Sequence, residues 1–145
     1  MDNGGTIWFE LGNNNHYWKD KRVQDFIHKF KLARVRIDGC QYGMSGKTAL
    51  IKKPWRVMTN NPELIVEFEN ATCTGGHAHE LCEHSAVTAK TSACPKALAV
   101  AIHVAYARHI QRRDPRFNTG EPSKEEWDVA AAILAKAKLL RDGAK

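Results

Sequence analysis

Cys73-Thr-Gly-Gly-His77-Ala-His79-Glu-Leu-Cys82-Glu-His84 is the stretch that decides how this chain is interpreted. It gathers five side chains that bind soft or borderline metal ions. Thiolate and imidazole groups are the ligands that a tetrahedral zinc ion prefers. The two glycines after Cys73 let the backbone turn tightly, so that Cys73 and His77 can face one ion. The stretch predicts a zinc site, and the alternative is a polar surface loop with incidental Cys and His residues.

Two ligand sets compete for this ion. The local set is Cys73, Cys82 and one or both of His77 and His79. The composite set is Cys40, Cys73, His77 and His79, in which a distant turn donates the first thiolate, and Cys82 is its first substitute. Because either set fills a tetrahedron, we expect a structural zinc rather than a catalytic one. Such an ion would contribute several kcal/mol to folding, on the order of other structural zinc sites.

Length and composition indicate one compact domain. The chain has 145 residues, of which 43% are hydrophobic. We expect a zinc-stabilised domain over residues 1–113 and a C-terminal helix over 114–145 that packs on it or extends from it. The longest apolar run, 97–107, is too short to cross a bilayer. The first residues lack the features of a signal peptide, which predicts a cytoplasmic location and favours metal binding over disulfides for the four cysteines.

The charge balance favours a polyanionic partner. Lys and Arg outnumber Asp and Glu by 22 to 16, which gives a net charge of +6. An excess of this size is typical of proteins that bind nucleic acid, but it also occurs on ordinary solvated surfaces. The residues predicted to contact phosphates are Lys52, Lys53, Arg56, Arg112 and Arg113. Trp18 and Trp55 are candidates for base stacking, with a place in the core as the alternative.

Hydrophobic periodicity predicts a small α/β domain of the α+β kind, with about three strands and three to four helices. The expected strands cover residues 6–9, 33–38 and 55–59. The expected helices cover 19–30, a short segment from Pro62, 95–113, and a segment that begins after Ser123. Residues 33–38 and 55–59 are expected to pair as an antiparallel hairpin with a long connection. Ser123 and Glu126 have the spacing of a capping box.

Two carboxylates are weaker candidates for a catalytic role. Glu10 ends the first strand, where carboxylates often meet substrates, but it could equally pair with Lys52 or Lys53. Asp38 could accept a hydrogen bond from Arg56 across the hairpin, and a structural pair is the favoured interpretation. The sequence contains no phosphate-binding glycine loop and no His-Glu-x-x-His helix.

The order of several short motifs resembles a group of phage and retroelement-encoded proteins that are similar to divergent C5-cytosine DNA methyltransferases. The motifs are Phe9-Glu10 with Tyr17-Trp18, Asp38-Gly39-Cys40-Gln41-Tyr42-Gly43, Lys53-Pro54-Trp55-Arg56 with Thr59-Asn60, and Cys73 with His77-Ala-His79. The resemblance implies that Glu10 is the carboxylate of the family's Glu-Asn motif and that Tyr42-Gly43 precedes the late hairpin of its core. It favours the composite metal set, whose four members match the pattern. Cys82, His84 and Cys94 do not match it.

The chain departs from this family at the positions that catalysis needs. Leu11 stands where the family has Asn, and no glycine-rich S-adenosylmethionine loop or Pro-Cys nucleophile occurs. We therefore expect a zinc-binding, basic accessory or nucleic-acid-binding domain of phage or mobile-element origin, not catalytic alone and located in the host cytoplasm. The alternatives are a metal-dependent nuclease, one half of a split DNA methyltransferase that needs a partner chain, and a phage protein that binds a host protein.

Overall fold

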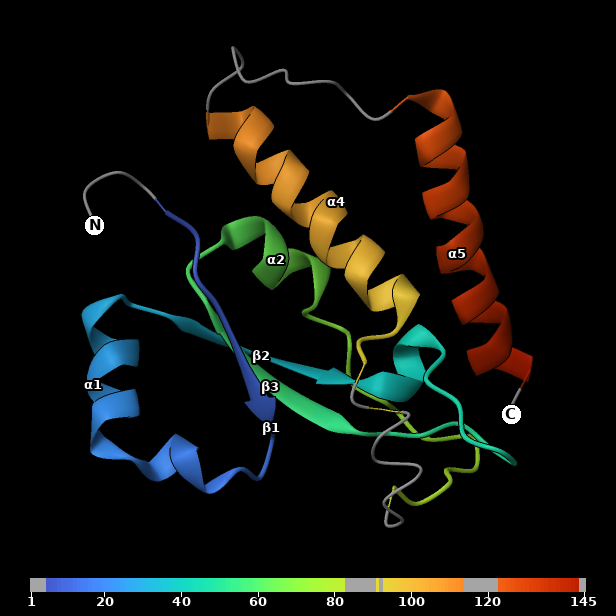
Figure 1. Ribbon diagram of the computed structural model, residues 1–145, viewed down its shortest axis with the longest axis horizontal. Coiled ribbons are helices and arrows are strands. Elements are labelled where there is room, and N and C mark those ends of the chain that lie inside the picture. Colours follow the sequence, from blue (N-terminus) through green and yellow to red (C-terminus); the bar gives the residue numbers. More distant parts are fainter. Residues whose placement is uncertain (1–4, 83–90, 92, 114–122, 144–145) are drawn as a thin grey trace.

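A three-stranded antiparallel sheet forms the centre of the protein (Figure 1). The computed structural model describes residues 5–82, 91, 93–113 and 123–143. The strands are β1 (Trp8–Gly12), β2 (Ala33–Asp38) and β3 (Pro54–Thr59), in the order β1-β3-β2. With the helices packed around this sheet, the fold is α+β, and the predicted fold class is confirmed.

The hairpin between β2 and β3 sets the register of the sheet. Val35 lies opposite Val57, and Ile37 lies opposite Trp55. Because side chains alternate along a strand, these four residues point to one face, where they join the main core. Arg34, Arg36 and Arg56 therefore point to the opposite face.

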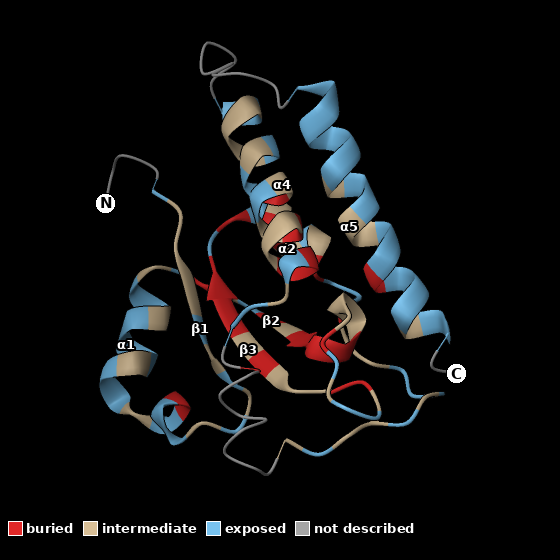
Figure 2. Cartoon of the chain, turned by 45° about the vertical axis from the view of Figure 1, so that its right-hand side comes forward, coloured by how far each residue is buried: buried red, intermediate tan, exposed pale blue. Residues whose placement is uncertain are grey.

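Two helices cover the face that carries the main core. They are α2 (Pro62–Glu67) and α4 (Lys96–Arg113), and both lie on the same side of the sheet in Figure 1. α2 begins at Pro62 as predicted, and Asn61 caps it, because its side chain accepts hydrogen bonds from the backbone N–H groups of Glu63 and Leu64. Phe68, Leu64 and Leu98 are each 1% exposed and fill the space between sheet and helices. Figure 2 shows the same buried layer between β3 and the helices above it.

A second, smaller core lies on the opposite face. It is built from η1 (His16–Lys19), α1 (Lys21–Lys29) and the β1 side of the sheet, with Trp18 and Met58 at its centre. The sequence predicted a single helix over 19–30, but the helix divides at Asp20. Asp20 has an extended backbone, and its side chain caps α1 by accepting a hydrogen bond from the N–H of Arg22.

The last helix, α5 (Lys124–Gly143), packs against α4 and against η2 (Gly39–Tyr42). The predicted capping box is present: Ser123 N–H donates to Glu126 at 2.7 Å, and Glu126 N–H donates to Ser123 Oγ at 3.2 Å. Most of α5 is exposed (Figure 2). The proposed boundary at residue 114 lies outside the described residues, so the division into 1–113 and 114–145 stays a prediction. Within the described part of the chain, no helix has the length and apolar character to cross a bilayer.

Candidate metal centre

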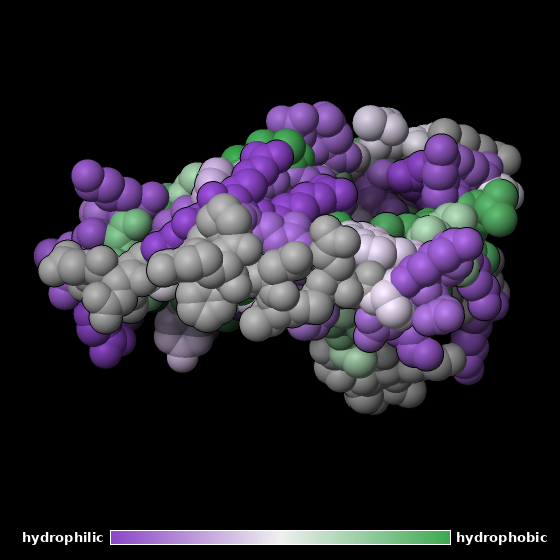
Figure 3. Space-filling view, turned by 90° about the horizontal axis from the view of Figure 1, so that it is seen from above, coloured by the Kyte–Doolittle hydropathy of each residue, from purple (hydrophilic) through white to green (hydrophobic). Residues whose placement is uncertain are grey.

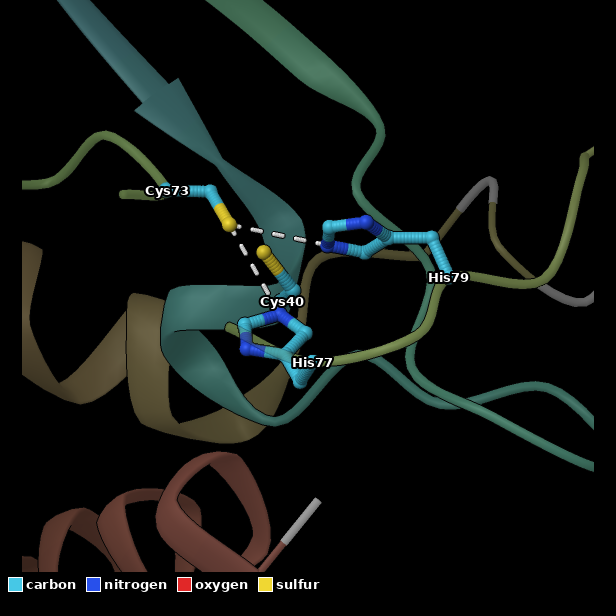
Figure 4. A group of neighbouring side chains, drawn as sticks. All are labelled: Cys40, Cys73, His77 and His79. Atoms are coloured by element: carbon cyan, nitrogen blue, oxygen red, sulfur yellow. Dashed lines mark hydrogen bonds between the residues drawn. The ribbon is translucent and has the colours of Figure 1, made fainter. Parts of the chain in front are cut away.

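Four side chains from two separate parts of the chain come together at the end of β2 (Figure 4). They are Cys40 from η2, and Cys73, His77 and His79 from the segment after α2. One sulfur or nitrogen atom of each residue lies within 4.8 Å of those of the other three. The four residues of the composite set therefore lie close enough together to bind a metal ion.

The separations between sulfur and nitrogen have the size that tetrahedral coordination requires. Cys73 Sγ lies 3.6 Å from His77 Nε2 and 3.6 Å from His79 Nε2. Ligands of a tetrahedral zinc ion, bound at about 2.3 Å for sulfur and about 2.0 Å for nitrogen, lie about 3.6 Å apart along an S–N edge. The two imidazole rings are steeply inclined to each other, at 68°, so they approach the sulfur from different directions.

Cys40 is held in place by the tight turn that ends β2. Its side chain is fully buried, and it lies in the short helix η2 directly after Gly39. Gly39 N–H donates to the carbonyl of Lys52 at 2.5 Å. A Cβ atom at position 39 would lie 2.9 Å from Met44 Sδ and 3.3 Å from the carbonyl oxygen of Ile51, so the backbone is closely packed here and a larger residue would displace the Met44 side chain. The turn therefore fixes the Cys40 thiol on the buried side of the cluster.

Asp38 positions the second cysteine. Its carboxylate is fully buried, and Oδ2 accepts a hydrogen bond of 2.8 Å from the backbone N–H of Cys73. Its own N–H donates to the carbonyl of Ala71 at 2.9 Å. The sequence predicted a hydrogen bond from Arg56 across the hairpin. The described structure instead pairs Asp38 with Arg36 of the same strand, with Nε 3.5 Å from Oδ1, an ion pair without a hydrogen bond. These contacts tie Asp38 to the backbone and to Arg36, and a catalytic role for Asp38 stays a prediction.

The two histidines are placed by a turn and by a short strand-like contact. Gly75 and Gly76 have φ values of +88° and +82°, which glycine adopts without strain. His79 then forms a parallel bridge with Leu50, and Glu80 N–H donates to the carbonyl of Leu50 at 2.8 Å. The Glu80 carboxylate accepts bonds from Thr48, at 2.9 Å from its N–H and 3.1 Å from its hydroxyl. The role of Glu80 in holding the loop beside His79 was not predicted from the sequence, although its position next to a predicted ligand could have indicated it.

The protonation of the cluster depends on burial. Burial raises the pKa of the Cys40 thiol to about 11, and the adjacent Cys73 adds to the effect. Burial also lowers the pKa of His79, helped by the charges of His77 and Lys52. A neutral His79 can bind a metal through its lone pair, whereas Cys40 has to lose its proton to become a ligand. Metal binding is therefore expected to release protons.

The alternative ligands lie elsewhere. Cys82 Sγ is 3.2 Å from Thr91 Oγ1, and Cys82 is not a member of the cluster. Cys94 lies just before α4 and is exposed as a whole residue, but its sulfur is partly shielded from water, which raises the pKa of the thiol. His84 lies outside the described residues. The local set, which depends on Cys82, is thus not the one that the described structure assembles.

The other predicted site residues are dispersed. Glu10 is exposed on the sheet face of the main core and accepts a hydrogen bond from Trp8 Nε1 at 3.2 Å. Lys52 and Lys53 precede β3, and the ammonium of Lys53 donates to the carbonyl of Thr91. Arg56 lies on β3, whereas Arg112 and Arg113 end α4, where Arg112 pairs with Glu63.

Trp18 and Trp55 are 4% and 7% exposed, so both rings belong to the core and cannot stack on bases.

No protein-family model, curated protein sequence or solved structure matches this chain. The resemblance to C5-cytosine methyltransferase-like proteins therefore stays a prediction.

Asp38→Ala is predicted to loosen the metal centre. Loss of the charged acceptor for Cys73 N–H should lower the free energy of unfolding by about 2 kcal/mol and weaken metal binding by roughly 10- to 100-fold. Urea denaturation and competition with a zinc indicator measure the two effects. Asp38→Asn is the matched control, because it retains one carbonyl acceptor and should lose less of both. An alanine variant as stable and as tight as the wild type would show that Asp38 does not position Cys73.

Proposed function

We propose that this protein is a nucleic-acid-binding or accessory domain whose fold is held together by one structural zinc ion. The convergence of two thiols and two imidazoles on one point carries the zinc part of the proposal. Two sulfur and two nitrogen donors suit zinc better than magnesium or calcium, which prefer oxygen ligands. The ion would link the end of β2 to residues 73–79, a segment without helix or extended strand.

A structural role for the ion agrees with the number of ligands. Four protein donors complete a tetrahedron and leave no position at which a water molecule or a substrate could bind. A metal-dependent nuclease needs such an open position, and so the donor set favours a binding domain over an enzyme. Half of a split DNA methyltransferase is the second candidate, supported by the motif order from Phe9-Glu10 to His79 that resembles that family. A phage protein that binds a host protein is the third.

The nucleic-acid part of the proposal rests on charge. The net charge is +6, and the view in Figure 3 shows a mainly hydrophilic surface on which hydrophobic side chains form smaller patches. Basic surfaces attract the phosphate backbone regardless of sequence, and binding of this kind weakens steeply with salt. Of the predicted phosphate contacts, Arg56 lies on the sheet and Arg113 is exposed at the end of α4.

The zinc site predicts different outcomes for the four cysteines. Cys40→Ser and Cys73→Ser should abolish stoichiometric zinc and lower the melting temperature by roughly 10 °C or more, because a structural ion contributes several kcal/mol in a chain of this size. Cys82→Ser and Cys94→Ser are the matched controls, and both should keep one zinc per chain. Elemental analysis and thermal unfolding are the measurements. Loss of zinc from Cys82→Ser together with retention in Cys40→Ser would favour the local ligand set.

Nucleic-acid binding is predicted to be strongly salt-dependent. If five basic residues each neutralise one phosphate, the slope of log affinity against log salt concentration should be about −3.5 for a single-stranded oligonucleotide. Fluorescence anisotropy with a labelled oligonucleotide measures it, and the oligonucleotide should remain intact when Mg²⁺ is added. Cleavage that depends on His77 would point to the nuclease, and an absence of binding at low salt would overturn the nucleic-acid part of the proposal.

A further inference from the structure

Three arginines lie together on the half of the sheet that α1 leaves uncovered. The second core occupies the β1 side of this face, with Phe9, Leu11 and Met58 beneath η1 and α1. On the β2 side, the same face carries Arg34, Arg36 and Arg56. Arg34 is exposed, and the side chain of Arg36 is 39% exposed. β2 is an edge strand, so this side of the face lies at the border of the sheet (Figure 1).

The register of the sheet places two of these arginines directly opposite each other. Arg36 lies directly opposite Arg56. Asp38 N–H bonds outside the sheet, to Ala71, and the Pro54 carbonyl accepts from Asn13. Asp38 and Pro54, which lie opposite each other, are therefore a non-hydrogen-bonded pair. Pairs two residues apart along an antiparallel ladder are of the same kind, so Arg36 and Arg56 are also a non-hydrogen-bonded pair, in which Cα atoms are about 4.5 Å apart. Arg34 is diagonal to Arg56, within reach of a long side chain.

The protein supplies little negative charge to balance the group. Asp38 is the one carboxylate paired with it in the described residues, 3.5 Å from Arg36, and that carboxylate also binds the N–H of Cys73. Arg56 lies over the ring of Trp18, with Cζ 5.1 Å from the ring centroid. The Nε atoms of Arg36 and Arg56 are buried and have no hydrogen-bond partner within the described structure. Arg34 makes no ion pair among the described residues.

Such an arrangement costs stability when no ligand is bound. Like charges directly opposite each other in a sheet are destabilising. Burial lowers the pKa of Arg56, and the nearby charge of Arg34 lowers it further, as expected where two guanidinium groups share one face of a sheet. A bound anion would reduce this repulsion by placing negative charge beside the guanidinium groups.

We propose that Arg34, Arg36 and Arg56 form a phosphate-binding site and that this site holds the backbone of a nucleic acid. Arginine suits this task because its planar guanidinium donates two parallel hydrogen bonds to phosphate oxygens. The site rests on the proposed function and deepens it, because it places the main contact on the sheet rather than at Arg112 and Arg113. Arg36 is fixed by Asp38 and Arg56 by Trp18, so two of the three donors are held in position before the ligand binds.

The test is the double variant R34Q/R56Q with K124Q/K138Q as the matched control. Both lose two positive charges, but Lys124 and Lys138 are exposed on α5. R34Q/R56Q leaves the pair of Arg36 and Asp38 intact. In anisotropy titrations with a labelled single-stranded oligonucleotide, it should bind at least 10-fold more weakly than wild type, and the salt slope should become shallower by about 1.4. K124Q/K138Q loses the same amount of charge away from the proposed site, so it should bind within about twofold of wild type.

Stability provides a second readout. R34Q removes repulsion and leaves the contact of Arg56 with Trp18 intact, so this single variant should melt at or above the wild-type temperature. A lower melting temperature of R34Q would contradict the repulsion. If R34Q/R56Q bound the oligonucleotide as tightly as the wild type does, the arginine site would be overturned and the proposed function would stand. Wild type that binds no oligonucleotide would overturn both. Binding of an acidic polyglutamate peptide at the affinity of the oligonucleotide, with equal loss in the variant, would overturn the phosphate assignment in favour of an acidic protein partner.

Discussion

The approach of Cys40 to Cys73, His77 and His79 joins the end of β2 to a distant part of the chain, because all four donor atoms lie within 4.8 Å of one another. Cys73, His77 and His79 lie within residues 68–82, which contain no helix and no extended strand. Such a segment gains little from hydrogen bonds of its own, and it has to be fixed by side chains. A chain of 145 residues forms a core of limited depth, and a metal cross-link between distant segments adds stability where packing is thin.

Asp38 connects this centre with the arginines of the sheet. One oxygen of its buried carboxylate accepts from Cys73 N–H, and the other faces Arg36. A buried carboxylate needs both partners, because an unpaired charge in the interior costs several kcal/mol. The same side chain therefore fixes a metal ligand on one side and a cation on the other. The candidate metal centre and the arginine group therefore share one support, the end of β2.

Sequence patterns were sufficient where local chemistry decides the structure. The alternation in residues 33–38 predicted β2, and Asn61 and Ser123 predicted the starts of α2 and α5. The division of the first helix at Asp20 was not predicted. Apolar residues at helical spacing continue from Trp18 to Phe30, on both sides of the capping residue, and hide the break. The sequence left the choice between Cys40 and Cys82 open, since spacing along the chain does not show which distant turn approaches the histidines. The arginine group was also missed, because the opposition of Arg36 and Arg56 exists only through the register of the sheet.

X-ray absorption at the zinc edge of the purified, zinc-loaded protein reports the ligand atoms of the metal and their distances. We expect two sulfur ligands at about 2.3 Å and two nitrogen ligands at about 2.0 Å, as in a closed structural site. A shell with one sulfur or three sulfurs, or a six-coordinate shell of oxygen and nitrogen, would contradict the assignment of Cys40, Cys73, His77 and His79.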